Sequence, residues 1–261
     1  MTESDETLIF RYSMEVNMKK LSLFLMVPVF LLLVNAAAPL TGNEVLKKLD
    51  DQQLTRDKVS VAEMKLIDSS GTTTERTLKM YTKGADDHLI RFLAPADIKG
   101  TGFLSRGSDN MWLYLPALGK VRRIAGHVSH GSFMGSDFSY RDLSSSGLAK
   151  DFTATVVSYK DGEYELLLKP KPGDASYSMV KLWTKDDMFV PLKMEFYDKS
   201  GKLLKTLINT EIKKIGGKWF PMSMTMDNVQ ENHKTEIIVK ELKVNTGLRD
   251  SMFTERTLKE Q

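Results

Sequence analysis

The stretch WFPMSMTMD, residues 219–227, alternates apolar and polar side chains through most of its length. Successive side chains of a β-strand point to opposite faces of a sheet, so a period of two separates the residues into two sets. The apolar set consists of Phe220, Met222, Met224 and Met226. The polar set consists of Ser223, Thr225 and Asp227. The stretch therefore predicts a strand with one apolar face and one solvated face.

Similar strands fill most of the chain. The stretch VPLKMEFYD, residues 190–198, has the same period. Its apolar face consists of Val190, Leu192, Met194 and Phe196. Short turns separate such strands, and the pair Asp161–Gly162 is a strong hairpin signal. We expect about ten or eleven antiparallel strands, a number and spacing that favour a barrel or a strongly curved sheet.

Two segments depart from this strand pattern. Thr41 is a good N-cap and Glu44 follows it by three positions, which predicts a capping box and a helix from Gly42 to about Leu54. The apolar stripe of this helix is narrow, so we expect it to lie on a surface. Residues 126–147 are rich in Gly and Ser, and they predict a long loop with a short helix near residues 136–143. Loops of this length are often functional.

Composition excludes several classes of protein. The chain has 261 residues, a formal net charge of +3 and no cysteine. There are thus no disulfides, no thiolate metal site and no cysteine nucleophile. A dedicated nucleic-acid binder would carry more Lys and Arg on one face, so the pair Arg122 and Arg123 does not indicate one. Consecutive strand residues also point to opposite faces, so only one of these arginines could reach a given ligand.

The N-terminal region predicts export. A basic pair at residues 19–20 precedes a mostly apolar run over residues 21–34, and small residues follow it. This is the pattern of a cleavable signal peptide, and the run is short for a membrane span. We assign residues 18–37 to that peptide, 1–17 to a mis-annotated upstream extension and 38–261 to a single domain located in the periplasm. An uncleaved N-terminal anchor is the alternative.

Residue types of catalytic and metal sites occur in the long loop. His127 and His130 lie three positions apart, but no third ligand adjoins them, and two ligands do not make a metal site. Ser132, His130 and Asp137 include the residue types of a hydrolase triad, yet no Gly-x-Ser-x-Gly elbow occurs. We therefore expect no enzymatic activity, no catalytic residues, no metal and no cofactor.

The stretch MWLYLPALGKVRRI, residues 111–124, predicts a hairpin whose first strand is apolar on both faces. Met111, Leu113 and Leu115 share one face, and Trp112 shares the other with Tyr114. Both faces must then be covered. We expect Leu113 and its neighbours in a cleft, with Trp112 under residues 131–143.

The chain contains 15 methionines, a flexible and polarizable residue that suits surfaces for varied apolar shapes. Those of residues 222–226 either fill a barrel core or line a cavity for acyl chains. A barrel of so many strands is too wide for side chains to fill well, which favours the cavity. The residues expected to line this cleft are Met111, Leu113, Leu115, Val190, Leu192, Met194, Phe196, Phe220, Met222, Met224 and Met226.

Five blocks of sequence, in the same order, resemble one known family. They are residues 100–124, 131–143, 191–207, 216–226 and 234–248. Together they resemble the LolA-like outer-membrane lipoprotein-sorting proteins, from the superfamily that includes LolA, LolB and RseB. The resemblance covers about residues 41–258. It implies a mainly β fold, an unclosed antiparallel barrel whose open side is plugged by helices.

The resemblance also implies a function, a monomeric periplasmic carrier whose concave apolar face holds the acyl chains of lipid or lipoprotein. Its branch implies a relay from an RND-type, MMPL-like exporter of the inner membrane toward the outer membrane. An RseB-like sensor of mislocalised lipoprotein is the alternative. The LolA lid arginine is not transferred to Arg122 or Arg123. The expected motif or lid residues are Trp112, Tyr114, Pro116, Arg123, Phe133, Met134, Gly135, Ser136, Asp137 and Tyr140.

Overall fold

The structure is a computed structural model and describes residues 39–173 and 176–260. The expected upstream extension, residues 1–17, and the expected signal peptide, residues 18–37, lie outside the described residues. Within the described ranges no helix combines the length and the apolar character needed to cross a membrane.

The described residues form one antiparallel sheet of 13 strands in the order β6-β5-β4-β3-β2-β1-β13-β12-β11-β10-β9-β8-β7. The strands are β1 (Asp57–Ile67), β2 (Thr73–Lys83), β3 (Asp87–Ala94), β4 (Gly102–Arg106), β5 (Met111–Leu115), β6 (Lys120–Arg123), β7 (Phe152–Lys160), β8 (Glu163–Pro170), β9 (Met179–Lys185), β10 (Lys193–Tyr197), β11 (Leu203–Ile215), β12 (Lys218–Asn228) and β13 (His233–Val244). The sheet does not close, because β6 and β7 are its two edges. This confirms the expected unclosed antiparallel fold, with more strands than the ten or eleven expected.

Two meanders make up this sheet. Strands β1 to β6 pair in sequence order, as do β7 to β13, and the antiparallel pairing of β1 with β13 joins the two. The register shifts within four strand pairs, β1–β13, β2–β3, β7–β8 and β10–β11. Such irregularities bend a strand and increase its twist, which curves the sheet.

The helices are few and short. They are α1 (Gly42–Gln53), α2 (Tyr140–Leu143), α3 (Leu148–Asp151) and α4 (Glu255–Lys259). The expected capping box of α1 is present. The Thr41 side chain accepts a hydrogen bond from the Glu44 N–H, and the Glu44 carboxylate accepts one from the Thr41 N–H. The apolar stripe of α1 is buried and the helix packs against α3, β7 and β12.

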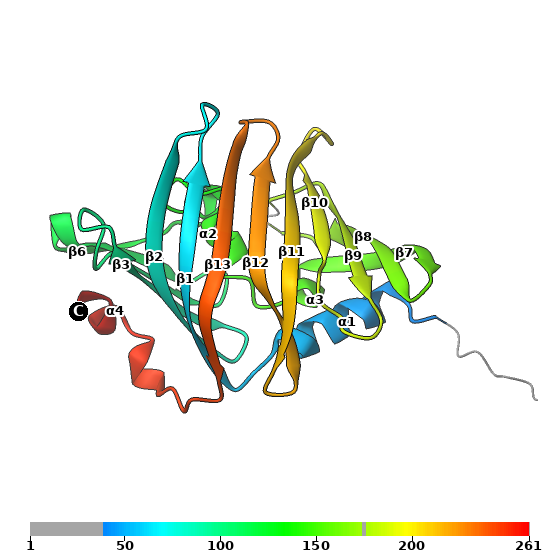
Figure 1. Cartoon of the computed structure of the whole chain (residues 1–261), viewed down its shortest axis with the longest axis horizontal. Coiled ribbons are helices and arrows are strands. Elements are labelled where there is room, and N and C mark those ends of the chain that lie inside the picture. Colours follow the sequence, from blue (N-terminus) through cyan, green and yellow to red (C-terminus); the bar gives the residue numbers. More distant parts are fainter. Residues whose placement is uncertain (1–38, 174–175, 261) are drawn as a thin grey trace, which may run out of the picture. The chain divides into compact units, whose positions relative to one another are not determined.

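Residues 124–151 connect one edge of the sheet, β6, to the other edge, β7. We call them the crossing segment. They carry α2 and α3, which lie behind the central strands in Figure 1. The main hydrophobic core contains Phe133, Phe138 and Tyr140 of this segment together with residues of β1 to β5, β8 to β10, β12 and β13. The crossing segment therefore covers the inner face of the sheet.

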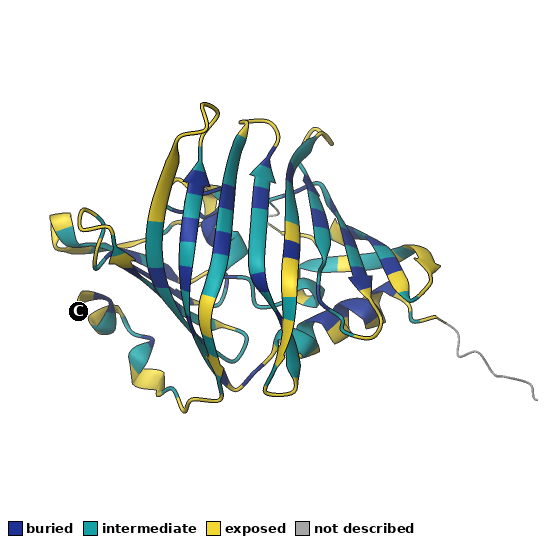
Figure 2. Cartoon of the chain, in the orientation of Figure 1, coloured by how far each residue is buried: buried dark blue, intermediate teal, exposed yellow. Residues whose placement is uncertain are grey.

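Burial alternates along the central strands. Buried bands repeat along β1, β12 and β13 in Figure 2. On β1, Ala62, Met64 and Leu66 point into the core, and the intervening positions include Glu63 and Lys65, which pair with other charged residues at the surface. The inner face is apolar and the outer face of these strands is charged, as the period of two predicts.

A second, smaller hydrophobic cluster lies on the outer face of β3 to β5. Its buried members are Leu89, Leu104, Phe253 and Leu258, and Trp112 and Tyr114 pack against them. The C-terminal helix α4 contributes Leu258 and packs on β4, β5 and β6.

The expectation that Trp112 lies under residues 131–143 is therefore wrong. Alternation correctly separated Trp112 from Leu113, but the crossing segment covers the Leu113 face, and α4 covers the Trp112 face.

The start of β10 also differs from the expectation. Val190 to Leu192 precede the strand, which begins at Lys193. Phe189 has a φ of 46°, and the carbonyl of Pro191 accepts a hydrogen bond from the Asn209 side chain at 2.8 Å. The positive φ at Phe189 turns the chain, and Pro191 has no N–H to donate to a neighbouring strand. The regular strand therefore begins only at Lys193.

A buried carboxylate holds the chain after β13. Asp57 is 1% exposed at its side chain and accepts hydrogen bonds from the N–H groups of Thr246, Gly247 and Leu248. The Thr246 hydroxyl donates a further hydrogen bond at 2.7 Å. Burial acts to raise the pKa of Asp57, but these hydrogen bonds outweigh it, so the pKa lies below its ordinary value.

Asp57→Asn should destabilise the protein by about 2 kcal/mol at pH 7, because hydrogen bonds to a charged group are lost. The folded-state pKa is depressed, so this stability is present above the unfolded pKa of about 4 and disappears as the pH falls through the folded value. Urea unfolding at pH 7 and at low pH measures the difference, which should shrink in acid. The exposed Asp187→Asn serves as control and should change stability little at either pH. A pH-independent difference would contradict the assignment.

Candidate functional site

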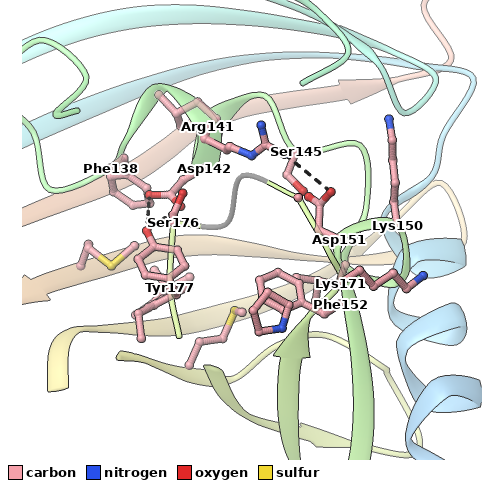
Figure 3. Close-up of a pocket in the computed structure, with 18 of the residues that line it drawn as sticks. Phe138, Arg141, Asp142, Ser145, Lys150, Asp151, Phe152, Lys171, Ser176 and Tyr177 are labelled. Atoms are coloured by element: carbon pink, nitrogen blue, oxygen red, sulfur yellow. Dashed lines mark hydrogen bonds and ion pairs between the residues drawn. The ribbon is translucent and has the colours of Figure 1, made fainter. Parts of the chain in front are cut away.

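A cavity of about 370 Å³ lies between the inner face of the sheet and the crossing segment. Figure 3 shows the side chains around it. Its floor is apolar and comes from three neighbouring strands, β10, β11 and β12. The floor residues are Met194, Phe196, Leu207, Met224 and Met226. They share the inner face because each strand places every second side chain there.

The crossing segment supplies the opposite wall. Phe138, Leu143 and Leu148 line the cavity from this segment, and Phe152 lines it from the start of β7. This wall has little regular structure, since α2 and α3 have four residues each. The cavity is therefore bounded by the sheet on one side and by the mostly irregular crossing segment on the other. Residues 170–173, 176 and 177, at the end of β8 and before β9, also line it.

A second cavity of about 330 Å³ adjoins the first. Leu148, Met194, Leu207 and Met224 line both of them, as does Ser145. The smaller cavity extends toward α1, where Leu49 and Leu54 line it, and toward the start of β1. Each volume lies within the range of small-molecule sites. The two cavities thus share an apolar floor under the crossing segment.

One buried ion pair attaches α2 to the sheet beside the larger cavity. Lys205 of β11 reaches Asp142 of α2 at 2.7 Å and the carbonyl of Asp137 at 2.9 Å. Tyr177 donates a hydrogen bond to Asp142 at 2.9 Å, which Figure 3 marks. The Lys205 ammonium also lies 5.2 Å from the Tyr177 ring centre. Lys205 is 5% and Asp142 15% exposed at the side chain, so this pair is largely shielded from water.

The charges of this cluster agree with its geometry. Burial acts to raise the pKa of Asp142. The adjacent Lys205 ammonium and several hydrogen bonds lower it by more, so the net shift is downward. Burial raises the pKa of Tyr177 well above its ordinary value, and the neighbouring Asp142 carboxylate adds to the effect. Asp142 is thus a carboxylate and Tyr177 a neutral phenol at neutral pH.

Two further polar anchors hold the crossing segment. The Asp137 carboxylate accepts a hydrogen bond from the Thr235 hydroxyl and contacts His233, each at 2.7 Å, and both partners belong to β13. The carboxylate of Asp50, in α1, accepts hydrogen bonds from the N–H groups of Leu148 and Ala149 at 2.7 and 2.8 Å. Burial raises the pKa of Asp50, more than these two hydrogen bonds lower it. Charged or polar groups, as well as apolar packing, therefore keep the segment on the sheet.

The comparisons with known proteins agree with this architecture. A family model whose description reads "-like: Uncharacterized protein" matches residues 84–260. An outer membrane lipoprotein-sorting protein domain from Vibrio parahaemolyticus is 33% identical, with a TM-score of 0.77 over 84% of this chain and 98% of the other. A DUF1329 family protein from Desulfovibrio piger is 32% identical, with a TM-score of 0.78 over 83% and 97%. The chain belongs to the LolA-like outer-membrane lipoprotein-sorting family.

A LolA superfamily protein from Nitrosomonas europaea shares the fold at 20% identity, with a TM-score of 0.71 over 84% of this chain and 100% of the other. Among curated proteins, none matches this LolA-like chain. The resemblance inferred from the five blocks of sequence is thus confirmed.

The structure divides the residues expected to line a cleft into three groups. Met194, Phe196, Met224 and Met226 line one or both cavities. Met111 and Leu113 lie in the core beneath the crossing segment, and Leu115 packs against that core. Val190, Leu192, Phe220 and Met222 are not among the lining residues of these two cavities.

The expected motif or lid residues also fall in different places. Phe133 packs in the core between Phe92, Phe103 and Tyr140, with ring centres 5.4 to 5.8 Å apart. Arg123 bonds to the Asn110 side chain at 3.1 Å, and Pro116 opens a short 3₁₀ turn before β6. Met134 and Gly135 both have positive φ, at 53° and 81°, and Ser136 is buried beside them. These residues hold the crossing segment and the β5–β6 hairpin in place.

The residue types of a hydrolase triad do not assemble. Ser132 donates its hydrogen bond to the carbonyl of Ser136, His130 contacts Ser176, and Asp137 contacts Thr235 and His233. Within the described ranges no group of three His, Cys, Asp or Glu residues could hold a metal ion.

Several residues in or beside the two cavities are not predicted by the sequence. Leu207 lines both cavities, but β11 is apolar on both faces near it, so alternation does not single it out. Lys205 and Asp142 are 63 positions apart, and no local pattern joins them. Leu148 lies in a short polar stretch whose helix no strong pattern predicts.

The buried pair should be strongly coupled in stability. Lys205→Met leaves Asp142 buried without its cation, and Asp142→Asn leaves the ammonium unpaired, so each should destabilise by about 3 kcal/mol. The double variant should lose less than the sum, with a coupling of at least about 1.5 kcal/mol by urea unfolding. The surface pair Lys240 and Glu63 is the control cycle, and its coupling should stay below about 1 kcal/mol. Additive effects at Lys205 and Asp142 would rule out the pair as an anchor.

Proposed function

We propose that this protein is a periplasmic carrier, without enzymatic activity, that binds the acyl chains of a lipid or lipoprotein. One observation carries the proposal, the pair of adjoining cavities with an apolar floor under the crossing segment. Met194, Leu207 and Met224 line both cavities, so an acyl chain can lie along this shared apolar floor. Methionine suits such a surface, because its side chain adapts to differently shaped apolar ligands.

The energetics favour this kind of ligand. Each buried CH₂ contributes about 0.8 kcal/mol, so even one acyl chain of moderate length binds usefully in an apolar cavity. The same chain exposed to water would associate with other apolar surfaces. A carrier for such a ligand must both shield the chain and release it. A rigid sheet on one side and a long segment held by discrete polar anchors on the other meet both needs.

Family membership supports the proposal. The relative from Vibrio parahaemolyticus is described as an outer membrane lipoprotein-sorting protein domain, and it resembles this chain over nearly the whole domain. Sorting to an outer membrane takes place in the periplasm. The signal-peptide pattern of residues 18–37 is consistent with that compartment.

The proposal extends to a route. The carrier receives its cargo from an RND-type, MMPL-like exporter of the inner membrane and delivers it to the outer membrane. Release requires the crossing segment to leave the sheet, and the anchors at Asp137, Asp142 and Asp50 are the contacts that must break. A partner that engages this segment would bias that opening. Site-specific photo-crosslinking from exposed positions of the segment, in cells, tests this route. Crosslinks confined to unrelated proteins would count against the exporter.

Protein purified from the periplasm without detergent should carry lipid. Native mass spectrometry should show a mass above that of the chain, and organic extraction should release the ligand for identification. The reason is that an apolar ligand shielded from water dissociates slowly. Cargo-free protein that also fails to take up a fluorescent fatty acid would overturn the carrier proposal.

A bulky residue in the floor should block the cavities. Leu207→Trp fills space that both cavities share and should weaken binding of a fluorescent fatty acid by more than about tenfold, since several buried CH₂ contacts are lost. The neighbouring Ile208 lies on the outer face and is 46% exposed, so Ile208→Trp is the matched control and should bind normally. Equal affinity of the two variants would show that the ligand binds elsewhere.

A further inference from the structure

The smaller cavity contains one cation without an ionic partner. Lys58 of β1 points to the inner face, and its ammonium lies 6.0 Å from the ring centre of Phe220. It makes no ion pair or hydrogen bond to any residue in the described ranges. Burial lowers the pKa of Lys58, and no neighbouring carboxylate offsets that effect. A half-buried ammonium without a counter-ion is unfavourable, so its surroundings suit an anion.

The other ionisable groups of this cavity are already engaged. Asp50 accepts two N–H groups at the start of α3. His88 lies against the carbonyl of Ala85 at 3.1 Å and the hydroxyl of Thr82 at 3.5 Å. Burial, with the nearby Lys58 ammonium adding to it, lowers the pKa of His88 to about 4, so its imidazole is neutral at pH 7. Of the three, Lys58 alone offers a charge to a ligand.

Two lining residues carry polar atoms that lack a partner. The Oγ of Ser146 and the Oδ1 of Asn209 are buried, and neither has a hydrogen-bond partner within the described part of the chain. The Nδ2 of Asn209 donates to the carbonyl of Pro191, which fixes the orientation of the amide. Orphaned polar atoms are rare in protein interiors, and each of these two could accept a hydrogen bond from water or from a polar ligand group. Polar, unsatisfied groups thus gather at the smaller cavity.

We propose that the smaller cavity is a head-group site, in which Lys58 binds the carboxylate or phosphate of a single-chain anionic lipid. The chain of that lipid lies on the floor that the two cavities share and runs toward the larger one. This inference rests on the proposed carrier function and narrows it to one class of ligand. The polar end and the apolar floor are continuous, so one amphiphile satisfies both.

Ligands with the same chain and different head groups distinguish the affinity of the head-group site from that of the apolar floor. Dodecanoate, dodecyl phosphate and dodecanol carry the same chain and differ in head group. The protein should bind at least one of the two anions about tenfold more tightly than dodecanol, because a hydrogen bond to a charged group contributes about that factor. Calorimetric titration measures all three. A preference for dodecanoate assigns a carboxylate, and a preference for dodecyl phosphate assigns a phosphate.

Variants of Lys58 test whether this residue causes the preference for anions over dodecanol. Lys58→Met keeps the apolar stem and removes the charge, so it should bind the three ligands equally, with dodecanol affinity unchanged. Lys58→Arg should retain the preference for the anion. Lys150 lines the larger cavity and is 54% exposed at the side chain, so Lys150→Met is the matched control and should also retain the preference. Lys58→Met removes an unpaired ammonium, so its melting temperature should be no lower than that of the unchanged protein.

Two results would overturn the head-group site while leaving the carrier intact. One is equal binding of anions and dodecanol by the unchanged protein. The other is a preference that survives Lys58→Met, whether or not Lys150→Met abolishes it. Failure of all three ligands to bind would instead overturn the carrier proposal, and the head-group site with it.

Discussion

The pairing of β1 with β13 is the constraint on which the rest of the structure depends. It joins two meanders into one sheet and so places β6 and β7 at opposite edges. The residues between β6 and β7 must then connect the two edges of the sheet, and they do so across its inner face. The cavities exist because this connection is long and irregular, and because it lies over the sheet without filling every gap between the two.

The crossing segment combines two kinds of attachment. Its aromatic residues, Phe133 and Tyr140 among them, pack against the inner face near β3 and β4. Toward β10 to β12 the apolar contact is incomplete, and the ion pair of Lys205 with Asp142 takes over beside the larger cavity. Tight packing of aromatic residues and a few directed bonds thus hold the segment together. A ligand space is compatible with the second kind of attachment and not with the first.

Much of the fold could be predicted from the sequence, because the period of two is a local signal. It located β12 and the face of Met224 and Met226, and it separated Trp112 from Leu113. The capping box at Thr41 and Glu44 located the start of α1 in the same way. Alternation does not say which face is inner, however, and that depends on α4 and the crossing segment, which are distant in sequence. Hence the sequence predicts the wrong covering segment for Trp112. It does not indicate the roles of Lys205 and Leu207 or the isolated charge of Lys58.

The central pairing also determines the order in which the chain can fold. β1 ends at Ile67 and its partner β13 begins at His233, so most of the domain must be made before they meet. Pairing over so long a sequence separation is slow, since the loop must close before the contacts form. Until β13 arrives, β1 is an open strand edge and the inner face of each meander is uncovered. A chain that emerges in sequence order therefore exposes this edge for much of its synthesis. During that time the uncovered edge can pair with another chain, so it needs protection from aggregation.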